Sequence, residues 1–482
     1  MELLDGSIIE LTAAVRSGRV HAREVVEAAV RRIEERDAGL NAVVAVDSEP
    51  ALRRLAAAGG RPVGPLAGLP YLVKDLHAEV AGFPLTRGSR LAVGLAPAGT
   101  STLLRRLEQA GALIIGRTNS PEFGLNITTE PVLHGPTRNP WRPDRSAGGS
   151  SGGAAVAVAA GMVPAAHASD SGGSIRIPSA WCGVIGFKPT RGRNPAGPYR
   201  VDDWSGLSHE HAITRTVADS ALLLAVSSGL AAGEPYPVDG VQWTGAVGST
   251  GPGRALRVGL LTEAPDGTPV HPAYRGAAES VAAELAAAGH RVVPVGPVEP
   301  AGRLGPVLGA VIAGHLATAV DDICAATGRY AGPDTLEPAV LDLVERGRRA
   351  DARTQVRATM ALRRLAGELA AVLDGVDLLL SPTTARPAPP LGQLHTDRPA
   401  GELFREIFAI SPFVGMFNVT GGPAISLPWG RDDAGMPIGV QLGARPGDDR
   451  TVLAVAAALE ATRPDLVRPG PAPAGTGHGD PA

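Results

Sequence analysis

Two clusters of glycine and serine carry the residue types in this sequence that could do chemistry. The first is residues 148–153 (GGSSGG) and the second is residues 169–176 (SDSGGSIR). Consecutive glycines allow backbone conformations closed to other residues, and they let a ligand approach the main chain. The two clusters therefore predict a cradle in which a ligand lies against backbone N–H groups.

Ser174 and Lys74 are the residues from which we build a reaction. Ser174 follows two glycines, so N–H groups around residues 171–174 can converge on one point and stabilise an oxyanion. A serine hydroxyl is a poor nucleophile until a base removes its proton, and a lysine can do so only when desolvation or nearby cations make it neutral. Lys74 ends an apolar run, and Asp75 would favour the charged form unless its side chain points the opposite way.

Three other interpretations of the first cluster compete with this one. A phosphate loop has the same Gly-x4-Gly spacing, but Ala154 stands where that motif needs lysine. A nucleophile elbow at residues 149–153 would make Ser151 the nucleophile, but it needs a preceding strand, and residues 138–145 contain two prolines. A flexible linker is disfavoured because apolar helices and strands flank both clusters.

The spacing of apolar residues predicts the elements that position these residues. Helices are expected between residues 7 and 36 and at 101–110, 154–160, 216–224 and 274–288, with further helices filling 307–373. Strands are expected at 66–75, 112–116, 256–261, 292–295 and 376–380. Thr216 and Asp219 fit a capping box at a helix start. We interpret residues 1–465 as one large α/β domain and residues 466–482 as a disordered tail, rich in proline and glycine.

Composition narrows the class of protein and of partner. The 482 residues are 44% hydrophobic and 19% charged, which excludes wholesale disorder, and the net charge of −3 offers no basic field for nucleic acid or a membrane. The N-terminus is acidic where a signal peptide would be basic, and the longest apolar run, residues 154–168, is too short to span a bilayer. Cys182 and Cys324 are too few for a disulfide framework or a thiolate metal cluster. A cytoplasmic protein with a small-molecule partner is expected.

Five motifs together resemble the amidase signature family, and they occur in that family's order over nearly the whole chain. They are residues 68–76 (GLPYLVKDL), 148–153, 169–178 (SDSGGSIRIP), 182–190 (CGVIGFKPT) and 418–428 (NVTGGPAISLP). Residues 128–131, 137–141 and 190–193 resemble a branch that hydrolyses cyclic amide oligomers. The resemblance implies an α/β fold, a single large domain whose central mixed β-sheet is flanked by helices.

The resemblance also implies roles for individual residues. Lys74 becomes the base, Ser150 a relay serine entered through a cis peptide, and Ser174 the acylated nucleophile. The implied oxyanion hole consists of the N–H groups of Ser171, Gly172, Gly173 and Ser174. The implied supporting residues are Asp170, Arg176 and Ser151. The implied pocket walls are Phe123, Asn126, Phe413 and Met416. His77, where the family more often has phenylalanine, is interpreted as a wall residue. No metal or organic cofactor is implied.

The expected function is hydrolysis of a small-molecule carboxylic amide, with no nucleic-acid or membrane partner and with a homodimer allowed. Acyl transfer to an amine in a biosynthetic pathway would use the same acyl-enzyme and stays open. The glutaminase subunit of a tRNA-dependent amidotransferase usually has glutamine where this chain has Ile177, which argues against that role. An inactive binding protein is disfavoured because all three triad positions are intact.

Overall fold

A central mixed sheet organises the computed structural model, which describes residues 4–200, 202–236, 238 and 253–463. In the described part of the chain eleven strands hydrogen-bond in the order β1-β3-β2-β4-β6-β5-β10-β11-β9-β7-β8. The strands are β1 (Val43–Val46), β2 (Pro70–Lys74), β3 (Leu113–Thr118), β4 (Ala165–Asp170), β5 (Ile185–Lys188), β6 (His209–Thr214), β7 (Arg257–Leu260), β8 (Arg291–Pro294), β9 (Leu378–Pro382), β10 (Ala424–Arg431) and β11 (Pro437–Gly443). The predicted fold class is confirmed.

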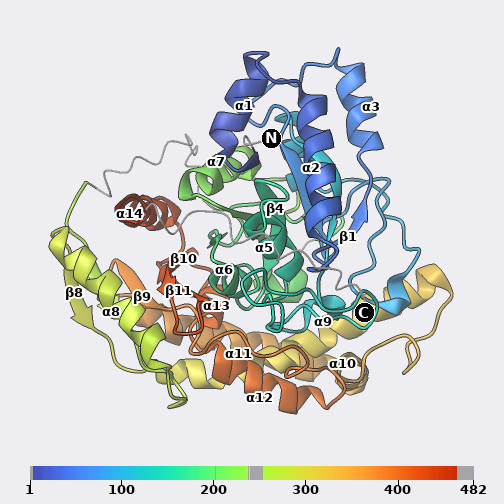
Figure 1. Cartoon of the computed structure of the whole chain (residues 1–482). Coiled ribbons are helices and arrows are strands. Elements are labelled where there is room, and N and C mark those ends of the chain that lie inside the picture. Colours follow the sequence, from blue (N-terminus) through green and yellow to red (C-terminus); the bar gives the residue numbers. More distant parts are fainter. Residues whose placement is uncertain (1–3, 201, 237, 239–252, 464–482) are drawn as a thin grey trace, which may run out of the picture.

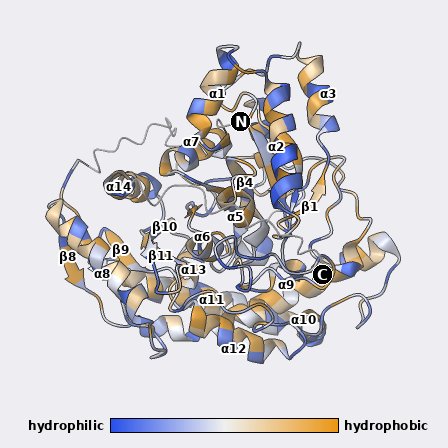
Figure 2. Ribbon diagram, in the orientation of Figure 1, coloured by the Kyte–Doolittle hydropathy of each residue, from blue (hydrophilic) through white to orange (hydrophobic). Residues whose placement is uncertain are grey.

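Helices cover the sheet on both sides (Figure 1). They are α1 (Ile8–Arg16), α2 (Ala22–Arg36), α3 (Glu49–Ala57), α4 (Thr102–Gln109), α5 (Gly152–Ala159), α6 (Arg176–Cys182), α7 (Val217–Ser227), α8 (Pro272–Ala287), α9 (Leu304–Thr327), α10 (Pro338–Arg349), α11 (Ala352–Ala371), α12 (Ala400–Ile410), α13 (Gly415–Thr420) and α14 (Asp449–Thr462). Helix α2 packs on β2 and β3, α5 on β4, and α6 on β10 and β11. Figure 2 shows mostly hydrophilic residues along the visible side of α2, and the buried residues of this helix include Val25, Val26 and Ile33.

Most of the expected elements are present within a few residues of their predicted bounds. The strand ending at Lys74 is β2, and β7, α8 and β8 form the expected unit with its two strands parallel. The capping box at α7 is only half formed. Thr216 Oγ1 accepts a bond from the Asp219 N–H at 3.1 Å, but the Asp219 carboxylate accepts from the Ile8 N–H at 2.9 Å, tying α7 to α1. The predicted tail, residues 466–482, lies outside the described residues.

One apolar helical stretch is longer than the sequence analysis anticipated. Among the described residues, Glu299–Thr327 is long and apolar enough to cross a membrane by length and composition alone, a test that the core helix of a soluble protein also passes. Within this stretch α9 packs against α10 and α11 and buries Leu308, Val311 and Val320. Packing inside the fold therefore accounts for much of its apolar character.

The first glycine cluster owes its composition to close packing at the start of α5. A Cβ atom added to Gly153 would lie 2.4 Å from the Asn119 backbone nitrogen and 2.5 Å from the Ala42 carbonyl oxygen. A Cβ at Gly152 would meet the Thr129 hydroxyl at 2.4 Å. These approaches to main chain and to buried polar atoms exclude any larger residue without a shift of the backbone. The cluster is thus a packing requirement as well as an entry to the site.

Replacing Gly153 with alanine should therefore destabilise the fold, by about 1–3 kcal/mol, because the added methyl group overpacks a rigid backbone. The matched control is Gly276→Ala on the exposed face of α8, where an added Cβ meets nothing within 4 Å. Alanine is the better helix former, so this variant should be more stable by roughly 0.5–1 kcal/mol. Urea unfolding of the two variants measures both effects, and equal shifts in the two would contradict the packing argument.

Candidate active site

Lys74 reaches the second glycine cluster because β2 and β4 are parallel neighbours. Tyr71 and Leu72 pair with Ala165 and Ala166, so the carboxyl ends of the two strands lie at the same edge of the sheet. Lys74 is the last residue of β2, and the loop of Ser171–Ser174 follows β4 directly. Lys74 Nζ therefore lies 3.0 Å from the Ser169 hydroxyl on β4.

Burial makes the Lys74 amine a base. The side chain is fully buried (0% exposed), and Nζ lies 2.8 Å from Ser150 Oγ. Desolvation lowers the pKa of Lys74 well below its ordinary 10.5; the Asp170 carboxylate opposes this shift and the Arg200 guanidinium adds to it. The neutral amine is therefore accessible far below pH 10.5, within hydrogen-bond distance of two serine hydroxyls.

Asp75 is directed away from Lys74, as the alternation of a strand requires. Its carboxylate accepts hydrogen bonds from the Thr86 N–H at 2.9 Å, from the Thr86 hydroxyl, and from the Gly88 N–H at 3.3 Å. The Asp75 charge is thus held by the turn at residues 86–88 rather than by the Lys74 amine. The objection raised by its place in the sequence does not apply.

Ser150 enters the site from the turn before α5. The Gly149–Ser150 peptide is cis, as the family resemblance implies, and Ser150 is buried. The neighbouring Ser151 joins the two clusters: its N–H donates to the Ser174 carbonyl at 3.2 Å, and its hydroxyl donates to the Ser169 carbonyl at 3.1 Å. Ser151 is therefore a bracing residue between the clusters.

Ser174 is half-buried and lines a cavity of about 80 Å³ together with Ser171 and Gly172. Among the described residues no hydrogen bond joins its hydroxyl to that of Ser150. Catalytic hydrogen bonds often tighten only when substrate is bound. The structure thus places Lys74 against Ser150 and leaves Ser174 facing the cavity.

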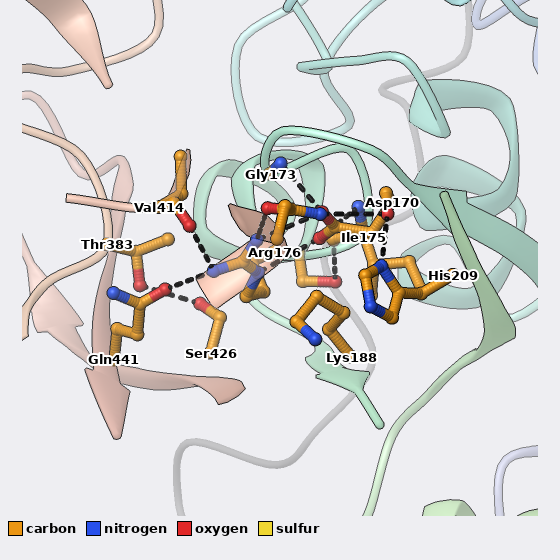
Figure 3. A network of polar contacts seen from close by, with 12 residues as sticks. Asp170, Gly173, Ile175, Arg176, Lys188, His209, Thr383, Val414, Ser426 and Gln441 are labelled. Carbon is orange, nitrogen blue, oxygen red and sulfur yellow. Dashed lines mark hydrogen bonds and ion pairs between the residues drawn. The ribbon is translucent and has the colours of Figure 1, made fainter. Parts of the chain in front are cut away.

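A buried ion pair holds the loop that carries Ser174 (Figure 3). The Asp170 carboxylate accepts from Arg176 Nε and Nη2, both at 2.9 Å, and from the Gly173 and Ile175 N–H groups at 2.7 and 3.1 Å. Burial alone would raise the pKa of Asp170, but the Arg176 charge and the hydrogen bonds lower it. Arg176 also donates to Val414, Asn418 and Gln441, which fastens the loop to α13 and β11.

One assignment to the oxyanion hole needs correction. The Gly173 N–H donates to Asp170 Oδ1 at 2.7 Å, so it is committed to the carboxylate that shapes the loop. Gly173 is buried, whereas Ser171, Gly172 and Ser174 line the cavity. The N–H groups of these three residues are the candidates that remain for binding an oxyanion.

The pocket walls were predicted less well than the polar residues. Phe413 and Met416 are not among the residues that line the cavity at Ser174, and they are buried in the core, 1% and 2% exposed. Asn126 does line the cavity, but its amide donates to the Leu394 carbonyl at 2.7 Å and its oxygen accepts from the Ile127 N–H at 2.8 Å. The apolar walls that the sequence analysis missed come from α9 and α12 and are Leu308, Ile312, Phe404, Ile407 and Phe408.

Phe123 and His77 lie on a neighbouring cleft instead of in the cavity at Ser174. His77 Nδ1 is 3.0 Å from the Asp203 carboxylate and 2.9 Å from Arg200 Nη1. Burial, followed by the Arg200 charge, lowers the pKa of His77 to about 3, although Asp203 opposes the shift. His77 is therefore a neutral wall residue. Within the described ranges no group of three His, Cys, Asp or Glu side chains is placed to hold a metal ion.

Comparison with known proteins identifies the class. It is a class of enzymes that have an α/β fold and hydrolyse amide C–N bonds. The chain belongs to the amidase family, whose model, described as Amidase, matches residues 24–453.

Two relatives and two solved structures show the extent of the similarity. The chain is 37% identical to a 6-aminohexanoate-cyclic-dimer hydrolase of Pseudomonas sp. (strain NK87), over 94% of this chain and 95% of that protein. It is 33% identical to an acylamidase of Rhodococcus erythropolis, over 95% of each. The structure of a 6-aminohexanoate cyclic dimer hydrolase complexed with substrate matches with a TM-score of 0.91 and 34% identity, covering 98% of this chain and 99% of that one. A bacterial aryl acylamidase matches with a TM-score of 0.84, 29% identity and full coverage of both chains.

Removing the Arg176 charge should leave Asp170 unpaired in the interior. We expect Arg176→Met to lower the free energy of unfolding by roughly 3–5 kcal/mol, because a lone buried charge is left behind. The loss should lessen as the pH is lowered, since protonation of Asp170 removes that charge. Arg142→Met is the control, because its pair with Asp144 is exposed and should contribute little. Urea unfolding at several pH values measures this, and equal effects of the two substitutions would refute the bracing role.

Proposed function

We propose that this protein hydrolyses carboxylic amides through an acyl-enzyme on Ser174, with Ser150 as proton relay and Lys74 as base. The observation that carries the proposal is the distance of 2.8 Å between Lys74 Nζ and Ser150 Oγ in a fully buried site. A lysine there can stay neutral at working pH, which is what a base toward serine requires. The loop of Ser174, held by Asp170 and Arg176, faces a cavity that can take the scissile group.

Proton transfer accounts for both halves of the cycle. As Ser174 Oγ attacks the carbonyl carbon, its proton passes to Ser150 while the Ser150 proton passes to Lys74 Nζ. The C–N bond breaks when the leaving nitrogen receives a proton from Ser150, which regains one from Lys74. Water then gives up a proton by the same route and attacks the acyl carbon; as the bond to Ser174 Oγ breaks, that proton returns from Lys74 through Ser150 to Ser174, and the acid is released. The N–H groups of Ser171, Gly172 and Ser174 would stabilise the oxyanion in both steps.

Linear and cyclic amides are the proposed substrates. The apolar walls of the cavity and the names of the relatives, a cyclic-dimer hydrolase and an acylamidase, support this choice. Since these relatives are named for hydrolysis, we place hydrolysis before acyl transfer and before the glutaminase role. The expectations of a cytoplasmic location, a small-molecule amide partner, no nucleic-acid or membrane partner, an allowed homodimer and no cofactor stay predictions.

Substitution of the base and the nucleophile should separate this mechanism from others. Lys74→Ala and Ser174→Ala should each lower kcat for a cleaved amide by at least ~10³-fold, because the triad acts as a unit. In the wild-type enzyme the acylation rate should rise with pH through the Lys74 pKa, below 10.5, since only the neutral amine accepts a proton. Stopped-flow acylation against pH, on the best substrate from a panel of aryl, aliphatic and cyclic amides, measures both effects.

Ser151→Ala is the control for the same experiment. The Ser151→Ala enzyme should still be acylated at Ser174, which intact mass and peptide mapping of the trapped enzyme would detect. Acylation at Ser151 in the wild type, or a Lys74→Ala enzyme with an unchanged rate and pH profile, would refute the proposed triad.

A further inference from the structure

A second cleft adjoins the cavity at Ser174. Its volume is about 330 Å³, and its polar lining includes His77, Arg87, Arg200 and Asp203. Trp204 lines both spaces, and two consecutive residues of one turn, Phe123 and Gly124, line the cleft and the cavity respectively. The cavity and the cleft therefore lie side by side at Trp204.

Arg87 is a cation without a partner in this cleft. Its guanidinium makes no hydrogen bond or ion pair with any described residue, and its Nε is buried and unpartnered. The backbone at Arg87 has a positive φ of 55°, a conformation that non-glycine residues rarely adopt. A buried donor of a charged group is normally hydrogen-bonded, so this one needs an explanation.

The other charged groups of the cleft are paired with one another. Arg200 also has a buried Nε without a partner, but its terminal nitrogens donate to Asp203 at 2.6 Å and to Glu210, so two carboxylates offset its charge. His77 is neutral in the site described above. Glu79, Asp203 and Asp75 offset the Arg87 charge in part, without forming an ion pair within 4 Å, and Asp322 lies at the exposed rim. Arg87 is thus the lining cation whose hydrogen-bond donors are left for a ligand.

The position of the cleft identifies which half of a substrate would enter it. His77 follows Lys74 by three residues, and both Leu76 and His77 line the cleft. In the proposed cycle the leaving nitrogen receives its proton from Ser150, which lies against Lys74. The amine half of the amide is therefore the half directed toward Lys74 and the cleft, while the acyl half meets the apolar walls from α9 and α12.

We propose that Arg87 binds a carboxylate carried by the amine half of the substrate, so that the preferred leaving groups are amino acids or ω-amino acids. The proposal rests on the proposed amidase function and names its substrate class. A guanidinium presents a rigid fork of donors that matches a carboxylate, and it retains its charge at all working pH values. The carboxylate would accept from the terminal N–H groups of Arg87, which make no hydrogen bond with the described residues.

A matched pair of substrates tests this with the wild-type enzyme. One is an N-acyl ω-amino acid, and the other is the N-acyl alkylamine of equal length, with the acyl group of the best amide in the panel. We expect kcat/KM for the carboxylate compound to be about ten- to a hundredfold higher, mainly through KM, the range expected for a hydrogen bond to a charged group. Equal values for the two compounds would overturn the proposal, whereas failure to cleave any amide would overturn the amidase function first.

Variants then locate the effect. Arg87→Gln should lower the ratio of the two kcat/KM values at least tenfold, and Arg87→Lys should restore part of it because the charge returns without the fork. Arg90→Gln is the control, since Arg90 lies three residues away outside the cleft and bonds the Pro333 carbonyl. It should leave the ratio unchanged. A ratio that survives in Arg87→Gln, or that falls equally in Arg90→Gln, would overturn the assignment; if Arg87→Gln fails to fold, the wild-type comparison still decides.

Discussion

The burial of one amine, Lys74 Nζ, is the constraint on which the rest of the site depends. A lysine beside serine hydroxyls is useful as a base only while it is neutral, and desolvation is the largest influence that makes it so. Two carboxylates could reverse this effect, and each is held elsewhere. Asp75 bonds the turn at residues 86–88, and Asp170 is paired with Arg176. The buried ion pair therefore shapes the nucleophile loop and also weakens the field that would otherwise protonate Lys74.

The architecture follows from bringing this amine to the Ser174 loop. Parallel pairing of β2 and β4 places their carboxyl ends at one edge of the sheet, and helix α5 then brings Ser150 to the same point. The close approach of α5 to the backbone near Asn119 and Ala42 leaves room only for glycine, which explains the cluster in packing terms. Buried polar groups are tolerated here because most are hydrogen-bonded to one another.

The features that could be predicted from the sequence are elements formed by neighbouring residues and residues that belong to a motif. The strand ending at Lys74 and the unit of β7, α8 and β8 follow from apolar spacing, and the Asp170–Arg176 pair follows from the family resemblance. Contacts between distant segments could not be read in this way. Phe413 and Met416 lie close in sequence to real wall residues, yet the orientation of α12 and α13 decides which side chains face the cavity. The hydrogen bond from the Ile8 N–H to the Asp219 carboxylate joins residues 211 positions apart in the sequence. Arg87 lies in a turn, where no helical or strand periodicity of apolar residues marks it.

The most direct test of the account is a titration of Lys74 itself. The chain contains two lysines, Lys74 and Lys188, so enzyme labelled with 13C at lysine Cε gives two NMR signals, and a Lys188→Arg variant leaves one. We predict that the Lys74 signal titrates with a pKa well below 10.5, so that neutral amine is present at the pH where the enzyme works. A signal showing that the Lys74 amine stays charged up to about pH 10.5 would contradict this prediction.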